Sequence, residues 1–78
     1  MKIFKVLGPG CKNCKNTARL IEEVAEKQGE EVSVVKVTEM EKILGYGVIS
    51  TPGVVQDEIV VHSGSVPTSA QVVGWLQG

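Results

Sequence analysis

The sequence contains a pair of cysteines, Cys11 and Cys14, with two residues between them and no other cysteine anywhere. Thiols at this spacing can exchange disulfide bonds or bind a soft metal ion. A disulfide that closes so short a loop restrains the unfolded chain by only about 2 kcal/mol, against about 4.7 kcal/mol for a loop of about a hundred residues. The pair is therefore suited to opening and closing rather than to holding a fold together.

The cysteines stand where a strand gives way to a helix. An apolar run over residues 2–7 predicts the strand, the loop Gly8-Pro9-Gly10 breaks it, and a helix follows from Cys11 to Gln28. The helix has one stripe of inward-facing residues: Thr17, Ala18, Ile21, Val24, Ala25 and Gln28. With Cys11 as the N-cap, its sulfur faces unpaired backbone amides and the positive end of the helix dipole, and both favour a thiolate.

This placement predicts different roles for the two sulfurs. Cys11, at the exposed helix end, is the candidate nucleophile, and Cys14, expected to be more buried, is the candidate that resolves the mixed disulfide. The predicted reaction is thiol–disulfide exchange. Lys12 and Lys15 add positive charge in the first turn, where they oppose the dipole, so we interpret Lys12 as electrostatic support for a thiolate. The alternative is that both are simply solvated lysines.

The remaining elements form the frame around the pair. The β-branched run from Glu31 to Val37 predicts a largely buried strand parallel to the first. Thr38 and Glu41 have the spacing of a capping box, which would open a short helix that ends at Gly45. Two short apolar runs, 54–55 and 59–61, predict a β-hairpin, and a second capping box at Thr68 and Gln71 opens a closing helix. The predicted order is βαβαββα, an α/β protein with a four-stranded mixed sheet and helices on both faces.

Three separated motifs give the chain a family resemblance: the run Gly8-Pro9-Gly10-Cys11-Lys12-Asn13-Cys14, then Thr51-Pro52, then Gly64 with Val66-Pro67. In these motifs the sequence resembles the thioredoxin superfamily, specifically its small bacterial and archaeal redox-disulfide proteins, nearly from end to end. The resemblance implies a thioredoxin-like fold, protein disulfides as substrates, a thioredoxin-reductase-type electron donor and no cofactor.

The resemblance also implies a substrate-binding role for Thr51 and Pro52. Pro52 would be the family's cis-proline beside the disulfide, presenting the backbone of Thr51 to an extended substrate segment. The sequence departs from larger thioredoxins at two points. Gly10 stands where those proteins usually carry Trp, and no acid lies in the first strand.

Bulk properties narrow the remaining possibilities. At 78 residues the chain is expected to be one domain, residues 1–78, and we expect a monomer. The formal charge of −1 with no basic run argues against a nucleic-acid partner. The N-terminal apolar stretch is too short for a signal-peptide core, and no stretch could span a membrane, which predicts a cytoplasmic protein without a membrane partner.

Two other functions remain open at this stage. The pair could belong to a Cys-X-X-Cys metal-binding protein, a carrier of zinc or copper(I), although zinc normally takes four ligands and His62 is the only histidine. The chain could also be a binding module in which the pair is incidental. His62 itself is predicted to face solvent from a strand, and it receives no catalytic role.

Three residues have uncertain places in this frame. Lys5 lies in the first strand, and either its stem extends to water or its charge lowers the pKa of a thiol. Tyr46, between two glycines, is a candidate for the loop that lines the site. Trp75 lies on the apolar stripe of the last helix and is predicted to be core.

Overall fold

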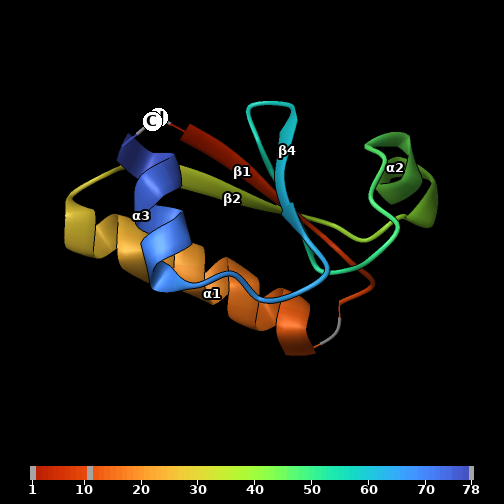
Figure 1. The fold of residues 1–78 in the computed structure, drawn as a ribbon, viewed down its shortest axis with the longest axis horizontal. Coiled ribbons are helices and arrows are strands. Elements are labelled where there is room, and N and C mark those ends of the chain that lie inside the picture. The colour runs from red at the N-terminus through yellow and green to blue at the C-terminus, as the bar shows by residue number, and fades with distance from the viewer. Residues whose placement is uncertain (1, 11, 78) are drawn as a thin grey trace.

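The computed structural model of the protein describes residues 2–10 and 12–77 (Figure 1). The elements occur in the order βαβαββα, as predicted. They are β1 (Lys2–Leu7), α1 (Lys12–Gln28), β2 (Val32–Val37), α2 (Met40–Gly45), β3 (Gly53–Gln56), β4 (Ile59–Ser63) and α3 (Ser69–Gln77). None of the helices in the described part of the chain is both long and apolar enough to cross a membrane.

The four strands form one mixed sheet in the order β2-β1-β3-β4. β1 pairs with β2 in parallel and with β3 antiparallel, and β3 pairs antiparallel with β4. β1 and β3 are therefore the central strands. Figure 1 shows α1 and α3 side by side on one face of the sheet, with the short α2 apart from them. Since α2 packs on the opposite face, the prediction of helices on both faces is confirmed.

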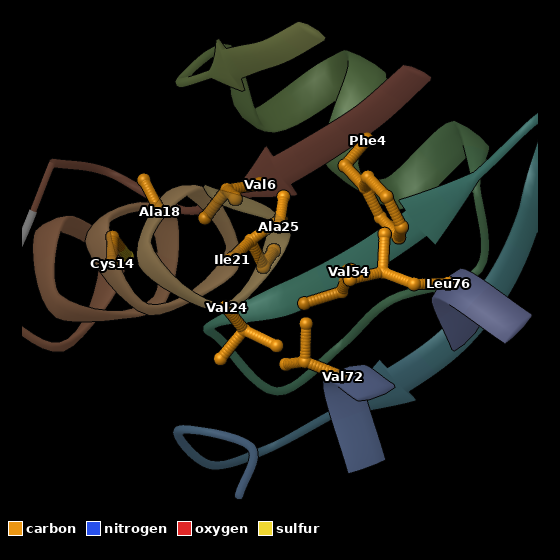
Figure 2. Close-up of a cluster of buried hydrophobic side chains, with 10 residues drawn as sticks. All are labelled: Phe4, Val6, Cys14, Ala18, Ile21, Val24, Ala25, Val54, Val72 and Leu76. Atoms are coloured by element: carbon orange, nitrogen blue, oxygen red, sulfur yellow. The ribbon is translucent and has the colours of Figure 1, made fainter. Parts of the chain in front are cut away.

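Alternation along the central strands produces two apolar clusters on opposite faces. The first lies between the sheet and helices α1 and α3 (Figure 2). Its buried members are Phe4, Val6, Cys14, Ala18, Ile21, Val24, Ala25, Val54, Val72 and Leu76. The second lies under α2 and consists of Leu7, Ile43, Val48 and Val55. The neighbours Val54 and Val55 thus point to different faces of β3, and both are fully buried.

Helix α1 follows the predicted apolar stripe closely. Its buried residues are Cys14, Thr17, Ala18, Ile21, Val24 and Ala25. Gln28, which the stripe included, is exposed because it lies at the last turn. Gly29 follows with a φ of +69°, a left-handed conformation that glycine adopts at helix ends without steric cost. The hydroxyl of Thr17 is satisfied inside the core by donating to the carbonyl of Asn13 at 2.8 Å.

The prediction that the second strand is largely buried is wrong. None of the residues of β2 is fully buried, and Val35 exposes 43% of its surface. The cause is its position at the edge of the sheet, where only β1 pairs with it. Consecutive valines can signal burial on both faces, but they cannot tell an edge strand from a central one.

One of the two predicted capping boxes is present and the other is not. At α3, Thr68 Oγ1 accepts the amide of Gln71 at 3.2 Å, and Gln71 Oε1 accepts the amide of Thr68 at 2.9 Å. At α2 the N-cap is Glu39 rather than Thr38, and it makes no side-chain cap bond. The short helix therefore starts one residue later than predicted, and packing of Ile43 into the second cluster stabilises it instead.

The predicted hairpin is confirmed although its turn contains no glycine. Asp57 and Glu58 connect β3 to β4 with φ values of 49° and 72°. Positive φ at both central positions is the geometry of the tight turns that match the twist of a hairpin. The ladder shifts register between Val54 and Val55, which marks a β-bulge.

Candidate functional site

Cys14 occupies the start of α1, where the sequence predicted it. Cys11 lies outside the described residues. Cys14 exposes only 5% of its surface and belongs to the first apolar cluster. In Figure 2 it stands at one end of that cluster, beside Ala18 and far from Leu76. Its thiol is therefore at the border between the core and the loop that leads into the helix.

Three segments distant in the sequence meet at this border. Gly8, the first residue after β1, is buried, and a Cβ placed on it would overlap the sulfur of Cys14. The same Cβ would lie 3.6 Å from the Cβ of Thr51. The end of β1, the first turn of α1 and the segment before β3 are thus in contact around the Cys14 thiol.

The segment before β3 is tied to the loop before α3. The Thr51–Pro52 peptide bond is cis, Pro52 is buried and Thr51 is partly exposed. The amide of Gly64 donates to the carbonyl of Pro52 at 3.0 Å. Of the motifs that carried the family resemblance, Gly8 lies against Cys14 and close to Thr51, and Pro52 is hydrogen-bonded to Gly64.

The charges of the first turn of α1 are all positive. Lys12 and Lys15 are exposed, and the turn contains no acidic residue. A cation there opposes the helix dipole, so these lysines do not stabilise the helix end. Their positive charges can interact with an anion near the start of α1.

Lys5 lies on the other face of the sheet, away from Cys14. Its amine donates to the Tyr46 hydroxyl at 2.7 Å and pairs with Glu58 Oε1 at 2.5 Å. The hydrogen bond that Lys5 donates to Glu58, and after it the one that it donates to Tyr46, raises the pKa of Lys5 to about 12. The bond from Lys5 lowers the pKa of Glu58 below 4.5. The amine of Lys5 is therefore bonded on the face opposite Cys14, and the hypothesis that its charge acts on a thiol stays a prediction. Tyr46 binds Lys5 and Glu58.

His62 and Trp75 pack against each other at the edge of the first cluster. Their ring centroids are 6.1 Å apart, and the Trp75 ring lies 6.3 Å from that of Phe4. His62 is half-buried, with its Nε2 3.1 Å from Ser65 Oγ, so the prediction of a solvent-facing histidine is wrong. The bulge in the hairpin explains this, since it breaks the alternation on which the prediction depended. Trp75 is half-buried against the core.

A zinc site would need more ligands than the cysteine pair. Among residues 2–10 and 12–77, no group of three or more His, Cys, Asp or Glu side chains is placed to hold a metal ion.

Comparison with known proteins agrees with this arrangement. The family model described as a thioredoxin domain matches residues 1–77. The chain belongs to the thioredoxin family. A curated relative named thioredoxin, from Methanocaldococcus jannaschii, is 31% identical over 72 residues, which cover 92% of this chain and 83% of the relative. Membership of the thioredoxin family supports a thioredoxin-like redox function of the thiol–disulfide kind.

Sequence reasoning missed two contacts, one at this thioredoxin-family site and one on the opposite face of the sheet. The first is the contact between Gly8 and the Cys14 sulfur, which no local pattern reveals. The available signal was only that a glycine directly follows the strand that leads to the cysteines. The second is the pairing of Lys5 with Glu58, residues 53 positions apart whose contact depends on the hairpin register.

Proposed function

We propose that the protein is a thiol–disulfide oxidoreductase that reduces protein disulfides in the cytoplasm, cycling Cys11 and Cys14 between dithiol and disulfide. The observation that carries the proposal is the burial of the Cys14 sulfur at the start of α1, against Gly8 and close to Thr51. A thiol in that place is shielded from direct contact with a substrate disulfide. It can react with a sulfur that arrives on Cys11, three residues before it in the chain.

In the proposed reaction the Cys11 thiolate attacks one sulfur of a substrate disulfide. The substrate S–S bond breaks, one substrate thiolate leaves, and a mixed disulfide forms on Cys11. Cys14 then gives up its proton and attacks the Cys11 sulfur. The Cys11–Cys14 bond forms and the second substrate thiolate leaves. Two electrons have moved from the cysteine pair to the substrate, and a thioredoxin-reductase-type donor returns them.

Three further residues have proposed roles in this cycle. Thr51, close to Gly8, precedes the buried Pro52, and we assign to the Thr51 backbone the pairing with an extended substrate segment. Thr51 is partly exposed, as such a contact requires. Lys12, exposed in the first turn, supplies positive charge near a thiolate at Cys11.

The test is reduction of insulin disulfides with dithiothreitol as the electron source. The wild type is expected to accelerate precipitation of the insulin B chain, and Cys11→Ser to give only the dithiothreitol background. Elemental analysis of the same protein, purified under reducing conditions, is the companion measurement. Stoichiometric zinc or copper together with no reductase activity contradicts the proposal and favours the metal-carrier alternative.

A further inference from the structure

Gly8 differs from Gly10 and Gly64 in the reason why a side chain cannot stand there. Gly10 and Gly64 have φ values of +89° and +90°, a left-handed conformation that itself favours glycine. Gly8 does not have a left-handed φ, so its backbone conformation would accept an alanine. Its amide continues the β1–β2 ladder by donating to the Val37 carbonyl at 2.9 Å.

What excludes a side chain at Gly8 is the sulfur of Cys14. A Cβ on Gly8 would overlap that sulfur and would come within 3.5 Å of the Cys14 Cβ. Cys14 is nearly fully buried in the first cluster, so its side chain has little room to turn away. An added methyl group must therefore displace either the thiol or the end of β1.

We propose that Gly8 is a positioning residue for the Cys14 thiol, and this inference rests on the proposed function. The missing side chain lets the sulfur lie directly against the backbone of the segment that runs from β1 into Cys11. The resolving step requires the Cys14 sulfur to attack the Cys11 sulfur in line with the bond that breaks. A displacement of about 1 Å at a reacting group can cost a factor of about 10² in rate.

The first experiment separates capture of a disulfide from its resolution. Dithiobis-nitrobenzoate, an aromatic disulfide, loses one coloured thiolate when Cys11 attacks it and the second when Cys14 resolves the mixed disulfide. In Gly8→Ala the first phase is expected to stay within about twofold of the wild type. The second phase is expected to slow by at least about tenfold, so that the mixed disulfide accumulates.

Gly74→Ala is the matched control. Gly74 lies in α3, is exposed, and a Cβ on it would meet nothing within 4 Å. Both phases should stay within about twofold of the wild type in this variant. A folded Gly8→Ala protein whose second phase is as fast as that of the control overturns the positioning role, because a purely structural glycine would change stability and leave the ratio of the two phases unchanged.

A stability measurement tests the same contact without any redox step. Cys14→Ala removes the sulfur that occupies the space over Gly8. The loss of stability caused by Gly8→Ala, measured by urea denaturation, should therefore be clearly smaller in the Cys14→Ala background. If Gly8→Ala does not fold alone, the second substitution should restore folding. Equal losses in both backgrounds, or no rescue, contradict the inference.

The two measurements also distinguish this inference from the proposed function. A wild type that never releases the second coloured thiolate contradicts the proposed function itself. The stability measurement depends only on the contact between Gly8 and Cys14, so it can support the inference even if the redox function is not found.

Discussion

At the scale of single residues, the burial of Cys14 supports the different roles proposed for the two cysteines. Cys14 exposes 5% of its surface and is enclosed by apolar neighbours, so its thiol cannot easily reach the disulfide of a bulky protein. A sulfur in that position can react only with a partner delivered next to it. The two cysteines should therefore not be interchangeable in a trapping experiment.

Replacing Cys14 by serine should stop the cycle at the mixed disulfide. The serine hydroxyl cannot displace the substrate thiolate, so a covalent complex through Cys11 should accumulate with insulin or with a peptide disulfide. Non-reducing electrophoresis and mass spectrometry of the linked peptides measure this. Cys11→Ser is the matched variant, and efficient trapping through Cys14 in that protein would reverse the assigned roles.

At the scale of elements, the three helices differ in the interactions at their N-termini. α3 begins with a reciprocal capping box between Thr68 and Gln71, whereas α2 begins at Glu39 without any side-chain cap. α1 carries Lys12 and Lys15 in its first turn, which is unfavourable for the helix and favourable for a nearby thiolate.

The two threonines that precede the short helices provide a direct comparison. Thr68→Ala removes an N-cap hydrogen bond and should lower the free energy of unfolding by about 1 kcal/mol. Thr38→Ala removes no cap bond and should cost less than about 0.5 kcal/mol. Urea denaturation of both variants measures the difference. Equal losses would mean that the cap at α3 contributes nothing beyond the threonine itself.

Lys12 should affect reactivity more than stability. In Lys12→Gln the rate of Cys11 alkylation by iodoacetamide near neutral pH should fall by up to about fivefold, because an exposed charge contributes about 0.2–1 kcal/mol to a neighbouring charge. Stability should not fall, since the helix dipole is better matched without the lysine. The effect should shrink in high salt.

Lys27→Gln, at the exposed far end of the same helix, is the control and should leave the alkylation rate unchanged. Equal alkylation rates for Lys12→Gln and the wild type at low salt would show that Lys12 does not support a thiolate at Cys11.

At the scale of the whole molecule, one polar cluster connects three parts of the fold on the face opposite Cys14. Lys5 from β1 binds Tyr46, which follows α2, and Glu58, in the turn of the hairpin. The Tyr46 hydroxyl also lies 3.2 Å from Glu58 Oε2. This cluster therefore links β1, the residue after α2 and the turn of the hairpin.

The cluster should give stability a defined pH dependence. The folded pKa of Lys5 is raised to about 12, so its contribution is complete below its unfolded value of 10.5 and is lost as pH rises through about 12. The folded pKa of Glu58 is lowered, so its contribution is complete above its unfolded value of 4.5 and is lost as pH falls through the lower folded value. Between these limits the contribution of the pair should not change with pH.

The stability difference between wild type and Lys5→Met tests this. It should be constant from about pH 6 to about pH 9 and should decrease as pH rises above 10.5. Lys5→Met/Glu58→Gln, which lacks both charges, is the control. A difference that grows above pH 10.5 would contradict the assignment of the raised pKa to Lys5.

Local patterns in the sequence were enough to predict the elements and the position of Cys14. The stripe of α1 apart from Gln28, the hairpin runs and the Thr68 cap depend on residues close together in the chain, and these were confirmed. The edge position of β2, the face of Lys5 and the closeness of Gly8 to Cys14 depend on contacts across the sheet. These contacts are set by strand order and register, which periodicity does not encode.

In the proposed function, Cys11 and Cys14 form one reversible dithiol/disulfide couple. Equilibrating the protein with mixtures of reduced and oxidised glutathione, then quenching with acid and alkylating the remaining thiols, measures this directly. Both thiols are expected to disappear together in a two-electron transition, with a Cys11–Cys14 bond in the oxidised protein and full reversal on reduction. A stable glutathione adduct on one cysteine, with the other still a thiol, would contradict it.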